Sequence, residues 1–459
     1  MNRDPQRKRE PRHVGRRRIG VITVVLATAL LAAACSSNSS SSTTTTAGGG
    51  GSSSNNGGAT APGVTATSIT IGATTPLTGP AAPGYDEIAA ATNAVFKWAN
   101  ATGGVNGRQI NYIVKDDAYN PVNTVNLTRQ LVQQNNIFAD VGSLGTPTQA
   151  AVEGFLNTNK VPQLFVESGC NCWSQASSPW TFGWQPNYTV EGKILGQYIK
   201  QKFAGQKIGY LYQGDEFGQD FIKGLDAELP SSSVVSRQTY DAATLAGPMS
   251  NQIAALKAAG AQVVALATVP AATALALLPA ASIGYSPQWV TSNVGADPPT
   301  VAALLNSFSK GAAGTSLLNG MISDAYAPPE ADTSNAWIQA IQKVLTKYDP
   351  GAPLDGNTEY GVALGYTFIQ ALQKAGPKLT RAGIVSAIET SGSKFVTPGL
   401  VPLTYSNTSH FGYSGAQMVT INNGASTVMG PVYTTTISGP ITTFTGTPQP
   451  PPASMLNIS

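Results

Sequence analysis

The hydrophobic positions of this chain follow two periods that alternate along most of its length. Residues 68–74 alternate apolar and polar side chains, which predicts a strand, and apolar residues at helical spacing follow over residues 85–102. Because strict alternation of strand and helix is typical of right-handed βαβ units, this run predicts a parallel sheet covered by helices. Its further elements are strands over 109–115, 137–141 and 161–166 and helices over 120–134 and 148–157.

A second run of the same kind follows a Trp- and Pro-rich stretch at 170–186. It predicts a second sheet, so the expected fold class is α/β with two doubly wound lobes. This run holds strands at 207–212, near Val234, at 262–267, 288–290 and 320–325, and helices at 190–203, 219–229, 249–259, 270–281 and 300–308. Helices at 334–348, 358–375 and 380–390, strands at 416–421 and 428–433, and a Pro-rich tail at 441–459 complete the chain.

The first 34 residues have the features of a bacterial signal peptide. A basic segment precedes the apolar run Ile19–Leu31, which is shorter than the roughly 20 residues that a membrane span needs. The sequence LLAAAC at 30–35 resembles the signal box of lipoproteins, in which the cysteine, here Cys35, carries the lipid. The box usually has Leu where this chain has Ala32, so simple secretion and an uncleaved anchor are the alternatives.

The segment 35–66 is rich in Ser, Thr, Gly and Asn and has few apolar residues. Such a segment buries too little surface to offset the entropy of ordering, so we expect a disordered tether between Cys35 and the folded body. A lipidated Cys35 would hold the body at the outer face of the bacterial cell membrane.

The net charge of +3 belongs to the N-terminus rather than to the body. Residues 1–34 hold eight of the 27 Lys and Arg and two of the 24 Asp and Glu, which leaves 19 basic and 22 acidic residues and a charge of −3. A body of this charge gives no reason to expect nucleic acid as a partner.

The sequence ADVGSLGTPTQ at 139–149 predicts a strand end, a Gly- and hydroxyl-rich loop and the start of a helix. Free N–H groups and hydroxyls at a helix N-terminus suit a carboxylate or another polar anionic group. Ligands of open α/β sheets lie at the carboxyl ends of the strands, which is where this loop belongs. Thr146 and Ser168 can equally act as plain helix caps.

The chain offers little for catalysis, so we expect no enzyme and no cofactor. A single His, His410, follows the signal segment, and neither a nucleophile elbow nor a phosphate loop is present. Cys170 and Cys172 are a possible disulfide in an exported protein, although a bridge across one residue needs a tight turn. A metal site at these cysteines lacks further ligands, so none is predicted.

Several short motifs carry a family resemblance by their order and spacing. In that order they resemble the leucine/isoleucine/valine-binding proteins, the type I periplasmic solute-binding proteins of ABC importers, over about residues 67–440. The motifs are ITIG at 69–72, PLTGP at 76–80, GGVNGR at 103–108, DD at 116–117, VG at 141–142, VP at 161–162 and DEFG at 215–218.

The resemblance implies two α/β lobes joined by three hinge crossovers, with the ligand between the lobes. On this chain the crossovers would lie near Gln185, Tyr326 and His410. Lobe 1 would be 67–185 and 327–409, and lobe 2 would be 186–326 and 410–440.

The resemblance also implies a set of ligand-binding positions, and two of them depart from the family pattern. The acid that balances a ligand ammonium falls at Asn293, and an amide cannot neutralise a buried charge. Asp215, Glu216 or Asp324 would then supply the charge, or the ligand lacks an α-ammonium. Gly84 replaces an aromatic residue, with Tyr85 beside it. The implied positions are Leu144, Gly145, Thr146, Ser168, Gly169, Cys170, Asn171, Phe217, Thr268 (or Val269), Asn293 and Tyr85.

The resemblance implies an exported solute-binding lipoprotein that delivers a small polar solute to the permease of an ABC importer. The solute would be an amino acid, an amide or a small carboxylate, and we expect the protein to be a monomer. The alternatives are a sensor of the same fold that signals to a partner, and an enzyme built on this scaffold.

Overall fold

The computed structural model describes residues 56–458 and contains two β-sheets. The signal segment, Cys35 and most of the expected tether lie outside the described residues. The first sheet has five parallel strands in the order β2-β1-β3-β4-β5. They are β1 (Ser68–Thr75), β2 (Gln109–Asp116), β3 (Asp140–Val141), β4 (Gln163–Val166) and β5 (Thr181–Gly183).

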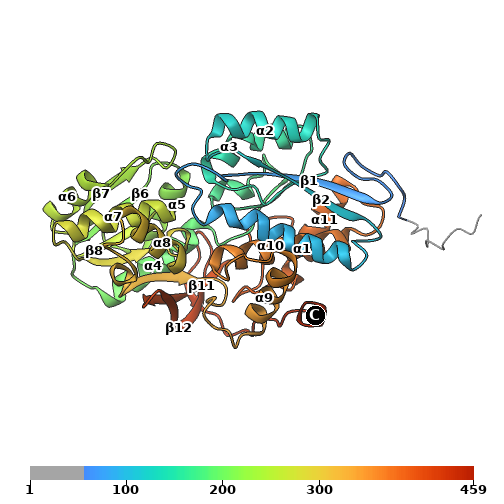
Figure 1. The fold of residues 1–459 in the computed structure, drawn as a ribbon. Helices are drawn as coiled ribbons and strands as arrows, with labels where there is room; N and C mark the ends of the chain where they lie inside the picture. Colours follow the sequence, from blue (N-terminus) through green and yellow to red (C-terminus); the bar gives the residue numbers. More distant parts are fainter. Residues whose placement is uncertain (1–55, 459) are drawn as a thin grey trace, which may run out of the picture. The chain divides into compact units, whose positions relative to one another are not determined.

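Helices cover both faces of the first sheet, as the βαβ pattern predicts (Figure 1). On one face, α2 and α3 enclose a small cluster of Val and Leu side chains. On the other face, α1 and the three late helices α9, α10 and α11 form one large core with Ile69 and Ile71. The bounds are α1 (Tyr85–Ala101), α2 (Pro121–Gln133), α3 (Thr146–Thr158), α9 (Ala336–Tyr348), α10 (Gly356–Ala375) and α11 (Arg381–Ser391).

The second sheet has eight strands in the order β13-β12-β11-β10-β9-β8-β6-β7. Strands β6–β10 pair in parallel, whereas β11, β12 and β13 add antiparallel strands beside β10. The strands are β6 (Ile208–Gln213), β7 (Val234–Tyr240), β8 (Val263–Ala267), β9 (Gln288–Thr291), β10 (Met321–Ala325), β11 (Gly415–Asn422), β12 (Ala425–Thr434) and β13 (Thr442–Thr443).

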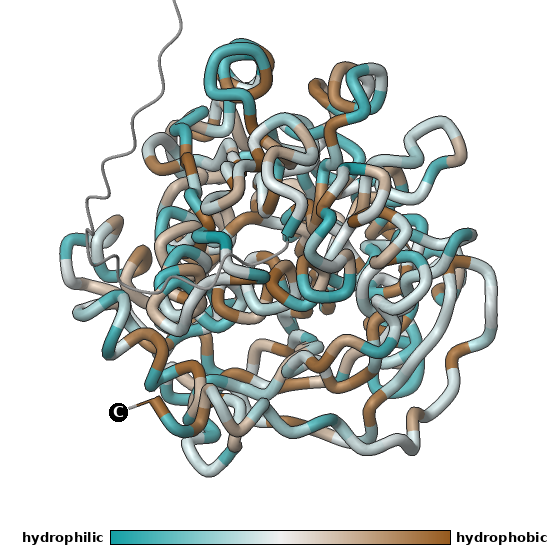
Figure 2. Tube along the Cα trace, turned by 90° about the vertical axis from the view of Figure 1, so that its right-hand side faces the viewer, coloured by the Kyte–Doolittle hydropathy of each residue, from teal (hydrophilic) through white to brown (hydrophobic). Residues whose placement is uncertain are grey.

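Five helices pack against the second sheet and bury an apolar core on each of its faces. Hydrophobic and hydrophilic residues alternate in short runs along the chain in Figure 2, as expected where an element has one face against a core. The helices are α4 (Tyr188–Lys202), α5 (Glu216–Glu228), α6 (Ser250–Ala258), α7 (Pro270–Ser282) and α8 (Pro298–Phe308).

The α/β prediction with two sheets is confirmed, and most elements lie within a few residues of their predicted bounds. The pattern missed β5 and the short β13, and it overestimated β3. Among the described residues, we find no helix long and apolar enough to cross a membrane.

The chain passes between the two sheets three times. It leaves the first sheet after β5, leaves the second after β10 and re-enters the second at β11. Aromatic rings pack together where these passages meet: the ring of Trp184 lies 4.6 Å from that of Tyr360 and 5.2 Å from that of Tyr413, and Tyr326 lies 5.6 Å from Tyr413. The passages therefore share one aromatic cluster, Trp184, Tyr326, Tyr360 and Tyr413.

Residues 56–66 are packed on the first lobe, which corrects the expectation of a tether as far as residue 66. Asn56 and Val64 are each 3 % exposed. The buried guanidinium of Arg108 donates to the carbonyl oxygens of Thr65 at 2.7 Å, Asn56 at 2.7 Å and Gly58 at 2.9 Å. The composition of the segment does not predict this packing, because the N–H groups that hold the segment belong to Arg108, which is distant in sequence.

We expect Arg108→Ala to lower the free energy of unfolding by about 2–4 kcal/mol, because the change leaves several buried carbonyl groups without a donor. Arg108 also donates to the carbonyl of Pro377 at 2.8 Å, so the loss loosens two chain segments together. Thermal unfolding measures the change. Lys202→Ala, at the exposed end of α4, is the control and should leave the midpoint unchanged.

The Pro-rich tail packs against α9. The Trp337 indole N–H donates to the carbonyl of Gln449 at 2.7 Å, and the Lys343 ammonium donates to the carbonyl of Leu456 at 2.5 Å. Met455, in the short helix α12 (Ala453–Leu456), is fully buried in the core of the first lobe.

Candidate ligand-binding site

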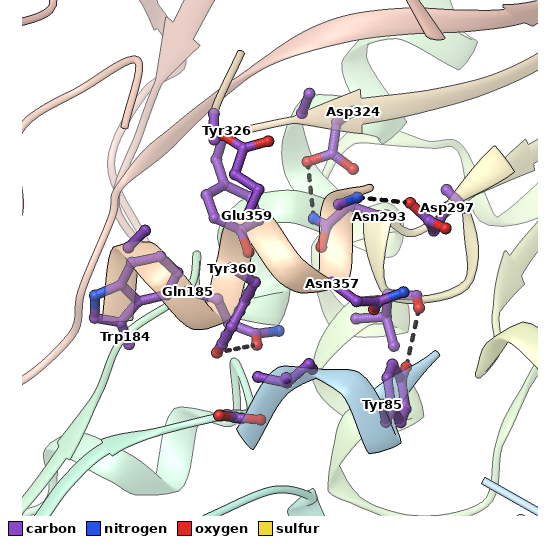
Figure 3. Close-up of a pocket in the computed structure, with 18 of the residues that line it drawn as sticks. Tyr85, Trp184, Gln185, Asn293, Asp297, Asp324, Tyr326, Asn357, Glu359 and Tyr360 are labelled. Carbon is purple, nitrogen blue, oxygen red and sulfur yellow. Dashed lines mark hydrogen bonds between the residues drawn. The ribbon is translucent and has the colours of Figure 1, made fainter. Parts of the chain in front are cut away.

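A cavity of about 170 Å³ lies between the two sheets and is lined by residues from both (Figure 3). The lining comes mainly from segments that follow the carboxyl ends of strands, together with the first turns of α1 and α10. Side chains from loops after β3, β4, β5, β9 and β10 converge there. This is the position at which open α/β sheets bind ligands.

The loop Leu144–Thr146 lines the cavity between β3 and α3. Gly145 adopts a φ of 108°, which favours glycine, and α3 begins at the next residue. The hydroxyl groups of Thr146 and Ser168 lie 2.7 Å apart and are hydrogen-bonded to each other. The N–H groups of Leu144 and Gly145 donate to the carbonyl oxygens of Thr74 at 3.0 Å and Glu167 at 3.2 Å.

Seven aromatic side chains form most of the apolar wall. The Tyr188 and Phe217 rings lie 4.5 Å apart on the side of the second sheet. The Tyr85 hydroxyl donates to the carbonyl of Val294 at 3.0 Å, and the Tyr360 hydroxyl donates to the Gln185 amide oxygen at 3.1 Å. The seven are Tyr85, Tyr119, Trp184, Tyr188, Phe217, Tyr326 and Tyr360.

Asn293 lies between two carboxyl groups. Its side-chain amide donates to Glu191 Oε1 at 2.7 Å and to Asp324 Oδ2 at 3.1 Å, and its backbone N–H donates to Glu191 Oε1 at 2.8 Å. Asp324 lines the cavity and is 3 % exposed. The amide at 293 therefore accompanies a buried acid instead of replacing one.

Burial and mutual repulsion keep the Glu191 and Asp324 pair from ionising fully. Burial raises the pKa of Asp324 to about 6, and burial together with the neighbouring Asp324 carboxyl raises the pKa of Glu191 well above its usual value. Two neighbouring buried acids do not ionise independently, because the charge of one disfavours the charge of the other.

Four further carboxyl groups line the cavity: Glu167, Asp297, Glu330 and Glu359. Burial raises the pKa of Glu330 to about 7, and it raises the pKa values of Glu167 and Glu359 well above normal. Glu167 Oε2, Asp324 Oδ1 and Glu359 Oε1 are buried without a hydrogen-bond partner. The site is thus both aromatic and acidic.

A model of the periplasmic binding protein family matches residues 68–426 of this sequence. The chain belongs to the periplasmic binding protein family. One similar protein is "Leu/Ile/Val-binding protein homolog 3" of Brucella melitensis, which is 23 % identical over 43 % of this chain and 53 % of that protein. Another is "Leu/Ile/Val-binding protein homolog 2" of Brucella abortus, which is 22 % identical over 71 % of this chain and 87 % of that protein. The family resemblance found in the sequence is confirmed.

Solved structures share the fold of this periplasmic binding protein. A fatty acid ABC transporter substrate-binding protein from Thermomonospora curvata superposes with a TM-score of 0.72 at 21 % identity, covering 85 % of this chain and 99 % of that one. A branched-chain amino acid ABC transporter protein from Thermus thermophilus, solved with bound valine, gives 0.70 at 18 % identity, covering 81 % and 97 %. Type I periplasmic binding proteins have two lobes, as predicted here.

Six of the ligand-binding positions predicted from sequence line the cavity. Phe217 forms part of the second-lobe wall, as the resemblance implied for it. Asp324, one of the acids considered beside Asn293, lines the cavity, whereas Asp215 caps α5 by accepting from the Phe217 N–H at 3.1 Å. The six are Tyr85, Leu144, Gly145, Thr146, Phe217 and Asn293.

The other five predicted positions lie outside the cavity lining. Ser168 supports Thr146, and the Thr268 hydroxyl bonds that of Thr273 at 2.7 Å while its neighbour Val269 lines the cavity. Asn171 faces α5 and donates from its backbone to Asp220 at 2.7 Å. Their ligand contact stays a prediction; the full set is Ser168, Gly169, Cys170, Asn171 and Thr268.

Cys170 and Cys172 form a disulfide in this structure, with Cα atoms 5.1 Å apart. The bridge closes the turn that begins the 3₁₀ helix Asn171–Ser174. It shapes the segment that leads from β4 to Asn171 and does not line the cavity.

Sequence reasoning missed the lining residues of the crossovers and of α10. Glu359 and Tyr360 belong to a helix whose apolar spacing predicts only a core helix. Trp184 lies in the Trp- and Pro-rich stretch at 170–186, where the sequence shows neither a strand nor a helix period. Glu167 follows a predicted buried strand, and a carboxyl at a strand end was the one signal that could have drawn attention to it.

Gly84 stands where the family pattern has an aromatic residue, and the structure gives a steric reason for the glycine. Its φ is 85°, and a Cβ there would lie 2.7 Å from the Asn357 amide nitrogen and 2.8 Å from Thr300 Cγ2. A side chain at this position would separate the first lobe from α8. Tyr85 supplies the aromatic ring at the cavity instead.

A pH effect is expected from Glu87, at the start of α1. Burial and the neighbouring Asp355 carboxyl raise its pKa from 4.5 to about 8. A carboxyl with a raised pKa contributes stability below its unfolded value of 4.5 that is lost as the pH rises through about 8.

Glu87→Gln should therefore unfold at the same temperature as the parent near pH 4.5 and about 1–3 °C higher near pH 8.5, since the partly exposed site is screened by solvent. Differential scanning calorimetry at both pH values measures this. The exposed Asp332→Asn variant should show no such divergence, and a Glu87→Gln midpoint equal to the parent's at both pH values would refute the assignment.

Proposed function

We propose that this periplasmic binding protein is an extracytoplasmic solute-binding lipoprotein that delivers a small solute to an ABC importer. The observation that carries the proposal is the cavity between the two lobes, lined from both sides by aromatic and polar side chains. Solved structures of similar fold are named as ABC transporter proteins for branched-chain amino acids and for fatty acids, which supports the importer role without naming the solute of this chain.

Closure of the lobes over the solute is the proposed mechanism. Three links join the lobes around the cavity: Tyr85 to the Val294 carbonyl at 3.0 Å, the Gly356 N–H to Asp297 Oδ1 at 3.0 Å, and the Asn357 amide to Thr300 Oγ1 at 3.1 Å. A solute that contacts both lobes stabilises the closed state by its differential contacts, and hinge motion at the three crossovers admits and releases it.

Membrane attachment through Cys35 is part of the proposal. Membership of this family implies an extracytoplasmic location, and the LLAAAC box supports lipidation of Cys35. Cell fractionation tests this: the Cys35→Ser chain should leave the membrane fraction, and its retention there would contradict the lipid anchor.

The central experiment is thermal unfolding of the purified protein against neutral, anionic and cationic solutes, paired with small-angle X-ray scattering. A solute at 100 times its dissociation constant adds about 2.7 kcal/mol, which shifts the midpoint by several degrees. The expected result is a midpoint shift and a smaller radius of gyration with the same compound. Turnover of that compound would favour an enzyme, and no response to any compound would overturn the proposal.

A further inference from the structure

Within the described part of the chain, the cavity lining contains acidic side chains but no basic ones. Five carboxyl groups line it, and of the described residues in the lining none is Lys, Arg or His. Glu167 and Glu359 come from the first lobe, where Glu167 follows β4 and Glu359 lies in the first turn of α10. Asp324 comes from β10 of the second sheet. The carboxyls thus face the space from both lobes.

Three of these carboxyls keep an oxygen without a donor although they are buried. Glu167, Asp324 and Glu359 are 6 %, 3 % and 5 % exposed, and Glu167 Oε2, Asp324 Oδ1 and Glu359 Oε1 have no hydrogen-bond partner. Buried carboxyl oxygens are nearly always satisfied, because an unpaired one costs several kcal/mol. A ligand that brings N–H donors to both lobes would satisfy them.

The aromatic walls suit a positive charge. Figure 3 shows Tyr326 beside Glu359 and Asp324, with Tyr360 and Trp184 further along the same wall. Aromatic faces attract organic cations, most strongly where water is excluded. The site therefore combines carboxyl groups, which can accept from the N–H groups of an organic cation, with ring faces, which can pack against the methylene groups of that cation.

An anionic ligand would meet few free donors at the first-lobe loop. The N–H groups of Leu144 and Gly145 already donate to protein carbonyls, and the Thr146 hydroxyl is bonded to Ser168. Within residues 56–458, no group of three or more His, Cys, Asp and Glu side chains is placed to hold a metal ion, which favours an organic cation.

We propose that the solute is a small organic dication, a diamine or a guanidino-amine with N–H groups at both ends. This inference rests on the proposed solute-binding function and names its substrate class. One end donates to Asp324 beside Asn293 and to Glu359, whose carboxyls both lie beside Tyr326, and the other end donates to Glu167. Tyr360 and Trp184 pack along the chain between the ends.

Isothermal titration calorimetry and thermal unfolding test the class directly. The cationic probes are 1,3-diaminopropane, putrescine, cadaverine and agmatine, and the comparison probes are leucine, valine and hexanoate. Saturable binding of at least one cation, with no shift by the comparison probes, is the expected result. Binding of leucine, valine or hexanoate alone would overturn the dication while leaving the solute-binding function standing; no binding by any probe would overturn both.

Charge-removing variants locate the two ends. Asp324→Asn and Glu167→Gln should each weaken binding of the best cation roughly tenfold or more, because each removes one partner of a buried charge pair. Glu216→Gln, an exposed acid on α5 outside the lining, is the matched control and should bind as the parent does. Unchanged affinity in both cavity variants, with their unfolding midpoints intact, would overturn the assignment.

Discussion

Trp184→Ala should lower the unfolding midpoint by roughly 5 °C, the largest stability effect expected here. The Trp184 side chain is 1 % exposed, and its indole N–H donates to Thr367 Oγ1 at 3.1 Å. Its ring packs edge-on against Tyr326, Tyr360 and Tyr413. The substitution would leave a cavity at the place where the chain passages meet, and buried Trp to Ala changes typically cost about 3–5 kcal/mol.

The same change should weaken solute binding at least about tenfold, because Trp184 also lines the cavity. Thermal unfolding and calorimetric titration measure the two effects separately. Trp180→Ala is the matched control, since Trp180 lies in the same Trp-rich stretch but outside the lining and is partly exposed. A Trp184→Ala chain that melts like the Trp180→Ala chain would contradict the packing role.

The layered fold was predictable because the two hydrophobic periods alternate without interruption over both runs. Ile69 and Ile71 alternate with polar residues in β1, and the apolar stripe of α1 faces them across the core. The missed β5 has three residues in a stretch crowded with Trp and Pro, where no period can be read. Its position depends on Thr181 pairing with Gln163 of β4, a contact distant in sequence.

The site was predictable only where a loop has its own local signal. Gly145 and Thr146 mark a turn at a helix start, and Asn293 follows a recognisable strand. The carboxyls of Glu359 and Glu167 carry no such signal, because their approach to one cavity depends on the packing of α10 against the first sheet. Charge at a site shared by two lobes is a property of the tertiary fold.

The replacement of an expected acid by Asn293 illustrates the same limit. Read alone, the amide argued against a ligand ammonium. The structure brings Glu191 of α4 and Asp324 of β10 to within hydrogen-bonding distance of it, so the negative charge is retained from other elements. A departure at one motif position does not establish the electrostatics of a site.

Asp220→Ala should weaken solute affinity about tenfold without touching the cavity, because it opens a link between the lobes. The Asp220 carboxylate on α5 accepts from the Asn171 backbone N–H at 2.7 Å and from the Asn171 side-chain amide. Hydrogen bonds to a charged group contribute about 1.5–3 kcal/mol, and this pair forms between the segment after β4 and a helix of the second lobe. Without this link, a smaller fraction of the molecules is closed. The apparent affinity for the solute falls in proportion to that fraction.

Calorimetric titration with the solute found for the parent measures the affinity, and small-angle scattering of the solute-free protein should show a larger radius of gyration in Asp220→Ala. Asn171→Ala keeps the backbone N–H that donates to Asp220 and removes only the side-chain bonds of Asn171, so we expect a smaller loss of affinity than in Asp220→Ala. Glu228→Ala, on the same helix, is the control. A larger loss of affinity in Asn171→Ala than in Asp220→Ala would mean that Asn171 acts on the solute itself, as the family resemblance first implied.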